Sequence, residues 1–434
     1  MLQPLAATAV RRKSHGGGTG RERNSHVIGS AGRWLIGGAT IQSLGEALYD
    51  LLIPLLVLQI TGSPVIMAAV FVVGYCMEII VGIVGGVIVD RINRRTLLIC
   101  IAALQAAVML GCALLDIATG ALPLWALFVT AAAIDFLVRL YLVADAAALP
   151  QVVGSAALPR ANGLMQSMLS TTQVAGPLIG GLALEWIDLR GALLLTTVVY
   201  VALAIFVGRI PLDTTKVATN PTTIIESYKQ AWRVVLDNSL LRRIVIWRGA
   251  FDFVIAGAFL MLLFLLQGPA EQSSSSVGVI VAIGAVGGIV GGLGFAQVQA
   301  AVPSWLVLAS GAALMCGALA SLAFARSSYI LAAATFVLFG ALSVVRRLLA
   351  QLFQSAVPNE MLGRVTAVSQ LIASVVGPIS VAIAAALSDS GRISILYIGS
   401  AIGVAALVAA LAFGPLRGSD WGIRNQSVTQ PNAA

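Results

Sequence analysis

Nine charged side chains lie inside long apolar runs of this sequence, where a charge is costly. They are Glu46, Asp50, Glu78, Asp135, Arg139, Arg248, Asp252, Arg346 and Arg347. An ionised group at the centre of a bilayer costs ~2.5–3.5 kcal/mol on insertion scales. Because so many groups are not expected to face lipid, we expect them to line a wet cavity between helices.

Carboxylates next to arginines can exchange protons. An apolar environment disfavours the ionised carboxylate, whereas a neighbouring guanidinium favours it, so movement of the arginine can load or release a proton. We expect Glu46 to be the leading proton carrier, with Asp50, Asp252 and Asp135 as further candidates. For Asp135 and Arg139, four residues apart, the alternative is an ion pair within one helix that only holds helices in register. The same alternative applies to the reversed pair, Arg248 and Asp252.

The composition predicts a membrane protein. Of 434 residues, 59% are hydrophobic and 10% are charged, and the mean hydropathy is +0.97. A soluble protein carries roughly 25% charged residues. The net charge of +8 does not indicate nucleic acid, because many basic residues flank apolar runs, as they do at membrane spans. The expected surroundings are therefore a lipid bilayer.

The apolar runs predict an all-α protein with twelve transmembrane helices in two six-helix halves, since a span needs about 20 apolar residues. The expected spans are 34–60, 65–89, 96–118, 121–148, 161–186 and 190–211, then 244–268, 277–299, 303–325, 328–354, 363–388 and 392–414. These runs define an N-terminal bundle (34–211) and a C-terminal bundle (244–414). A disordered tail (1–33), a linker (212–243) and a second tail (415–434) complete the chain.

The linker contains a possible surface helix. Thr223 and Glu226 have the spacing of a capping box. Ile224, Tyr228 and Trp232 would share one face, which predicts an amphipathic helix on the membrane surface. A plain linker remains the alternative.

The basic residues predict the orientation. With the N-terminus inside, cytosolic segments carry nineteen Lys and Arg residues and outside loops carry three. The positive-inside rule therefore places both termini in the cytosol of a multi-pass cell-membrane protein.

The two halves also repeat weakly. The Gly-Gly pair that ends at Gly86 recurs at Gly292, and Glu46 corresponds to Asp252 at the same offset of 206 residues. Such a parallel repeat is typical of transporters with a site near the bilayer midplane.

The stretch GVIVDRINRR resembles the loop motif G-x-x-x-D-R-x-G-R-R of the major facilitator superfamily, between the second and third spans. The matching positions are Gly86, Asp90, Arg91, Arg94 and Arg95. Asn93 replaces a glycine, and Asn also accepts a left-handed turn conformation. The resemblance implies that Asp90 faces the start of the eleventh helix and closes the cytosolic side, with Arg364 as a further partner. The alternative is that the cluster is only a positive-inside anchor.

The second copy of this motif has lost its charges. Ala296 and Gln297 stand where the acid and the arginine would be. The predicted cytosolic gate is therefore asymmetric.

The fifth span, GLMQSMLSTTQVAGPLIGG, resembles the antiporter motif of the same superfamily. The matching positions are Gly163, Gly176, Pro177, Gly180 and Gly181, while Thr172 replaces the middle glycine. The motif implies a bent helix packed closely against the opposite half, although glycine-rich membrane helices are often only packing seams. Stretches such as SLGEALYDLLIPLLVLQITGSP resemble the macrolide-efflux and enterobactin-exporter branch.

These observations predict proton-coupled efflux of a small amphiphilic molecule such as a drug, an antibiotic or a siderophore. An importer or uniporter of the same fold is the alternative. An enzyme is not expected, because the spans contain no histidine and no nucleophile next to a base. Neither a metal nor a cofactor is expected: His15 and His26 lie in the tail, and the four cysteines are scattered among apolar residues like small core side chains. We expect a monomer.

Overall fold

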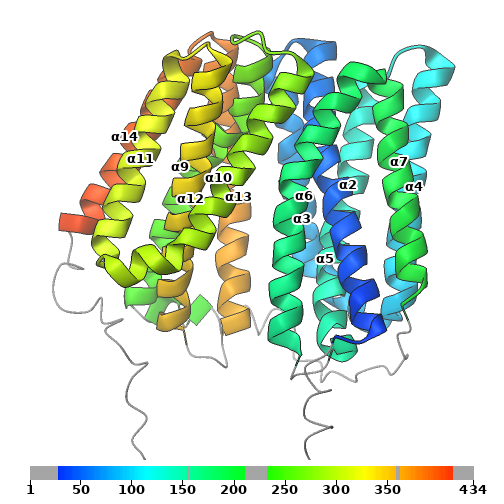
Figure 1. The fold of residues 1–434 in the computed structure, drawn as a ribbon, viewed down its shortest axis with the longest axis horizontal. Coiled ribbons are helices and arrows are strands. Elements are labelled where there is room, and N and C mark those ends of the chain that lie inside the picture. The colour runs from blue at the N-terminus through cyan, green and yellow to red at the C-terminus, as the bar shows by residue number, and fades with distance from the viewer. Residues whose placement is uncertain are drawn as a thin grey trace, which may run out of the picture.

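The computed structural model describes residues 28–153, 157–210, 232–233, 235–237, 239–357 and 362–413. Most of the two predicted tails and nearly all of the predicted linker helix lie outside these residues. The described chain is built from long α-helices joined by short connections (Figure 1).

A helix lies at the position of each predicted span, with ends that differ by a few residues. The first group comprises α2 (Ser30–Thr61), α3 (Pro64–Arg91), α4 (Arg94–Thr119), α5 (Leu124–Val153), α6 (Leu158–Trp186) and α7 (Asp188–Gly208). The second group comprises α9 (Ser239–Gln267), α10 (Ser274–Ala301), α11 (Ser304–Phe324), α12 (Ser328–Ala356), α13 (Leu362–Asp389) and α14 (Ile393–Phe413). α2 begins inside the predicted tail and α9 inside the predicted linker.

Nine helices within the described residues are long and apolar enough to cross a membrane. α13 and α14 contribute shorter apolar stretches, and α6, which contains several serine, threonine and glutamine residues, is not among the nine. The structure thus shows an all-helical membrane protein, and the number of spans stays a prediction.

Short polar and glycine residues set the helix ends. Gly62 and Gly120 end α2 and α4 with φ of +62° and +73°, in the left-handed region that glycine enters without strain. Ser63 and Ser273 cap α3 and α10 through their hydroxyl groups. The left-handed turn expected at Asn93 is wrong: its φ is −56°, and its Oδ1 accepts the backbone N–H groups of Arg95 and Thr96.

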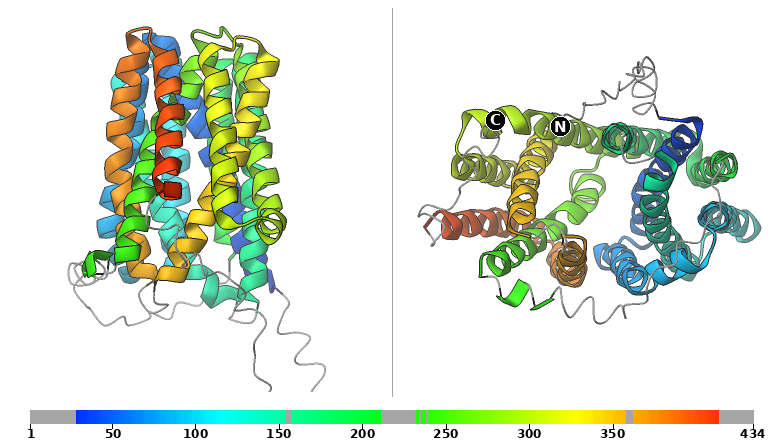
Figure 2. Two further views of the ribbon diagram at one scale, coloured as in Figure 1. Left: turned by 90° about the vertical axis from the view of Figure 1, so that its left-hand side faces the viewer. Right: turned by 90° about the horizontal axis from the view of Figure 1, so that it is seen from below.

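The two groups of helices form two bundles side by side (Figure 2, right). We call the end at which α2 begins and α14 ends the terminal end, and the opposite end the far end. α6 packs on α10 and α3 packs on α13, and these pairs are the main contacts between the bundles. Near the far end Leu51 and Leu55 of α2 join the core of the second bundle, while Leu260 and Met261 of α9 join that of the first.

One core prediction was wrong. Cys112 is buried, but Cys76 and Cys100 are exposed, so they do not act as core side chains.

Candidate functional site

Four carboxylates of the first bundle gather around one arginine. Arg139 of α5 interacts electrostatically with Glu46 and Asp50 of α2, with Glu78 of α3 and with Asp135 of its own helix. Glu46 is half-buried, whereas Asp50 is exposed. The sequence placed these groups on three separate helices, and the fold brings them together.

The pairing of Arg139 differs from the intrahelical alternative. Its Nη2 lies 3.9 Å from Glu78 Oε2, and Asp135 instead accepts a hydrogen bond of 3.3 Å from the hydroxyl group of Tyr49. Arg139 therefore ties α5 to α3 rather than closing a turn of α5. A single guanidinium cannot fully neutralise four carboxylates, so the cluster has room for further positive charge.

The second bundle carries a smaller cluster in which arginines outnumber carboxylates. Asp252 of α9 lies 3.9 Å from Arg248 Nε and 3.3 Å from Arg346 Nη2 of α12. The intrahelical pair predicted for Arg248 and Asp252 is thus present, but a second arginine shares the carboxylate. Arg347 is directed toward α10, where its Nη2 would lie only 2.8 Å from a Cβ built on Gly292.

The two clusters meet at α3 and α13. Glu78 Oε1 accepts a hydrogen bond of 2.8 Å from Gln370 of α13, and the Glu78 carboxylate therefore faces both bundles. One turn earlier on α3, Tyr75 interacts electrostatically with Glu78 and Arg139 on one side and with Asp252 and Arg346 on the other. Its ring packs against Gly377 of α13.

The loop-motif residues lie at the terminal end of α3 and the start of α4. Asp90 and Arg91 are exposed, and within the described part of the chain neither side chain makes a hydrogen bond or an ion pair. Arg94 and Arg95 donate to the carbonyl oxygens of Ala147 and Gly208, which ties α4 to α5 and α7.

The predicted contact of Asp90 with α13 therefore stays a prediction. The residues just before Leu362 and the side chain of Arg364 lie outside the described part of the chain.

The antiporter-motif glycines divide α6 into two parts. Near the far end, a Cβ on Gly181 would lie 2.7 Å from the Ser274 carbonyl oxygen, and one on Gly278 of α10 would overlap the carbonyl oxygen of Pro177. Gly176 and Gly180 pack in the same way on Ala47 and Leu51 of α2.

Two motif glycines near the terminal end are unconfined. A Cβ on Gly163 of α6, or on Gly86 of α3, would meet nothing within 4 Å. The close contact between the bundles thus belongs to the far end in this structure.

A carboxylate reinforces this far-end contact. Glu185 Oε2 accepts a hydrogen bond of 3.1 Å from the backbone N–H of Ser275, in the first turn of α10. A negative charge at a helix N-terminus is favourable because unpaired N–H groups point toward it. Sequence reasoning missed Glu185, Gln370, Tyr75 and Tyr49, since their partners lie on other helices. The only sequence signal was that Glu185 is an acid near the end of a span.

Comparison with known proteins gives the family. The family model described as Major Facilitator Superfamily matches residues 35–381. The chain belongs to the Major Facilitator Superfamily. Its members and structural neighbours are transporters, so this superfamily member is a membrane transporter and not an enzyme. No curated protein matches the chain.

Solved structures of superfamily transporters share the fold at low identity. The nucleoside transporter NupG is 12% identical, with a TM-score of 0.70 over 88% of this chain and 98% of that one. A bacterial homologue of the human lysosomal transporter Spinster, in an inward-facing conformation, is 13% identical, with a TM-score of 0.64 over 88% of this chain and 96% of that one.

A bacterial homologue of the iron transporter ferroportin gives a comparison of two states. Its inward-facing state is 15% identical and scores 0.69 over 87% of this chain and 97% of that one, whereas its outward-facing state scores 0.59.

Proposed function

We propose that this transporter is a proton-coupled exporter of a small amphiphilic molecule across the cytoplasmic membrane. The main support for this proposal is the cluster of four carboxylates around Arg139, formed by Glu46, Asp50, Glu78 and Asp135. Ionised carboxylates at this depth are costly unless they are neutralised. The cluster is therefore expected to hold protons or a positively polarised cargo, and exchange of one for the other couples the two flows.

The link between the bundles supports coupling. Glu78 pairs with Arg139 in the first bundle and accepts from Gln370 in the second. A rocking movement of the bundles that separates α3 from α13 would break the second contact. The surroundings of Glu78 would then differ between the two conformations of the transporter. A proton or cargo bound at Glu78 can shift the balance between these conformations only if it binds one of them more tightly than the other.

The orientation and the direction of transport are parts of the same proposal. We place both termini in the cytosol from the distribution of basic residues. The terminal end then faces the cytosol, and the protein takes up cargo there when Asp90 is unpaired. Export is favoured by the resemblance to the macrolide-efflux and enterobactin-exporter branch and by the fifth-span motif. We expect the transporter to act as a monomer.

The test uses inside-out membrane vesicles. A susceptibility panel with a deletion strain first identifies a cargo, and its movement is then followed in vesicles energised with a pH gradient, acid inside. The proposal expects uphill accumulation that collapses with the gradient and is lost in Glu46→Gln. Depletion from energised vesicles would identify an importer. Equilibration that ignores the gradient would identify a uniporter, and either result would overturn the proposal.

A further inference from the structure

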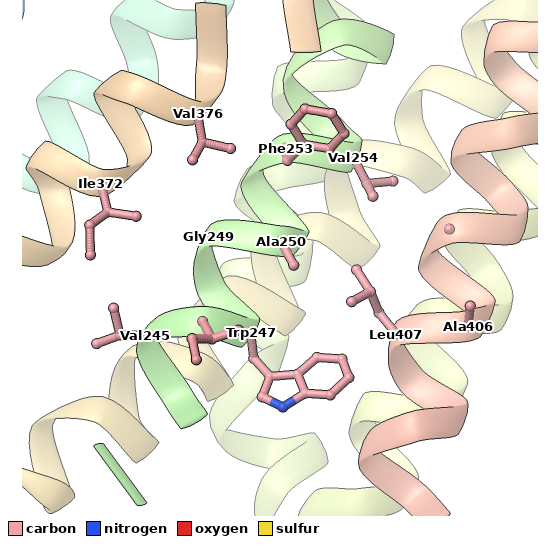
Figure 3. Close-up of a pocket in the computed structure, with 12 residues that line it drawn as sticks. Val245, Trp247, Gly249, Ala250, Phe253, Val254, Ile372, Val376, Ala406 and Leu407 are labelled. Atoms are coloured by element: carbon pink, nitrogen blue, oxygen red, sulfur yellow. The ribbon is translucent and has the colours of Figure 1, made fainter. Parts of the chain in front are cut away.

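An open, apolar groove on the surface of the second bundle lies away from the charged site. It has a volume of about 660 Å³ and is lined by residues of α9, α13 and α14 (Figure 3). This volume falls in the range of roughly 300–1,000 Å³ that is usual for small-molecule sites. None of the charged residues of the two clusters lines it.

The groove exists because α9 is pinned to α13 above it and small residues lie on its floor. The Ser380 hydroxyl group donates to the carbonyl oxygen of Phe253 and accepts from the backbone N–H of Gly257 at 3.0 Å. From that level toward the terminal end, Gly249 and Gly403 contribute no side chains. The surface is therefore hollowed at these glycines, whereas the larger residues around them form the walls of the groove.

The groove is open at the apolar surface of the second bundle, so it would face hydrocarbon when the spans lie in a bilayer. Its lining is apolar apart from the indole nitrogen of Trp247, which Figure 3 shows directed away from Phe253 and Val254. Exposed apolar side chains flank it on all three helices, including Ile246 (62%), Val375 (52%) and Ile402 (63%). A polar cargo would find no hydrogen-bond partner on these walls, whereas an acyl chain has no polar group that needs one.

A basic residue, Arg242, precedes the groove on α9. Arg242 precedes the lining residues Ile246 and Gly249 by four and seven positions, so it shares their face of α9 one turn closer to the terminal end. The side chain is exposed and donates to the Leu236 carbonyl oxygen at 2.9 Å. A guanidinium has several donors, and those that remain suit a phosphate. Basic sites beside membrane helices bind the headgroups of anionic lipids.

The geometry points to a lipid site: one acyl chain of an anionic phospholipid lies in the α9–α13–α14 groove, and its phosphate binds Arg242. The lipid comes from the leaflet at the terminal end. This site is separate from the transport site.

Native mass spectrometry of the full-length protein tests the site. The probes are palmitoyl-oleoyl phosphatidylglycerol and the phosphatidylcholine with the same chains. The wild type is expected to retain phosphatidylglycerol preferentially. Arg242→Gln should reduce that preference about fivefold, because one arginine near the surface contributes about that factor. Ala406→Trp, which fills the groove, should lower retention of both lipids roughly tenfold, since each excluded methylene counts.

Two controls lie on the first bundle. Val198→Trp introduces the same side chain at an exposed position of α7, and Arg160→Gln removes an exposed arginine near the start of α6. Both should retain lipid like the wild type. If Ala406→Trp gives too little protein, Ala250→Leu fills the groove from α9.

Equal retention of the two lipids by the wild type would overturn the site, as would unchanged retention after both groove substitutions. A third overturning result is loss of cargo transport in Ala406→Trp with lipid retention unchanged, because the groove would then serve the cargo. None of these results depends on whether transport is driven by protons.

Discussion

A methyl group at Gly278 should shift this transporter away from the observed state. A Cβ there would overlap the Pro177 carbonyl oxygen and lie 3.0 Å from the Gly181 Cα, and neither is the flexible end of a side chain. The strain can be relieved only if α6 and α10 separate at the far end. Overpacking of a tight interface costs about 1–3 kcal/mol, which corresponds to a roughly 5- to 150-fold change in the ratio of the two states.

Spin-label distances measure this change. Trp186 at the end of α6 and Tyr329 at the start of α12 are exposed, with 76% and 88% of their surface accessible, and they lie at the far ends of the two bundles. Cysteines at these positions, in a background without the four native cysteines, carry the labels. Gly278→Ala should add a long-distance component to the distribution.

The matched control is Gly294→Ala on the same helix, where a Cβ would meet nothing within 4 Å. Both variants gain the same helix propensity, so only the packing differs. If the two variants gave the same distance distribution as the parent protein, the close contact between α6 and α10 would not be what holds the far end closed.

Three further substitutions test other contacts. Glu185→Gln should lengthen the same distances, because an amide oxygen is a weaker acceptor than a carboxylate for the first turn of α10; an unchanged distribution would remove Glu185 from the closure. Glu78→Gln keeps an acceptor for Gln370 but loses the ion pair with Arg139. It should abolish energised transport in vesicles while changing thermal stability, followed by fluorescence-detected unfolding, by less than about 1 kcal/mol; a large loss of stability would make Glu78 structural. Gly86→Ala should express and fold normally, since its Cβ enters open space here, but should slow turnover if this surface meets α13 when the terminal end closes. Wild-type turnover would contradict the predicted gate.

The sequence was sufficient to predict where the long apolar helices lie and which charged residues they contain. Apolar length and the cost of buried charge act on each helix separately, so they can be read without knowing its neighbours. For the same reason the ion pair of Arg139 was missed. The spacing along the helix suggested Asp135 as its partner, whereas the packing of α3 on α5 brings Glu78 within reach. In runs that are apolar on every side, periodicity does not fix how a helix is rotated toward the others.

Contacts made by helix ends were also only partly predictable from the sequence. The Gly-Pro-x-x-Gly-Gly spacing predicted close packing by α6, and the contact with Gly278 agrees with it. The contact of Glu185 with the first turn of α10 could not be predicted from the sequence, because it depends on where along their lengths α6 and α10 meet. At Asn93 the family position predicted a left-handed turn, but the side chain could cap α4 directly, and it does so with an ordinary φ.

Proton binding by the carboxylate cluster can be measured without knowing the cargo. Purified protein in liposomes on a solid-supported membrane receives a step in pH, and the transient displacement of charge is recorded. The wild type should give a transient that is absent from empty liposomes and strongly reduced in a variant combining Glu46→Gln, Asp50→Asn and Asp135→Asn. A transient of the same size in that variant would show that these carboxylates do not carry the proton.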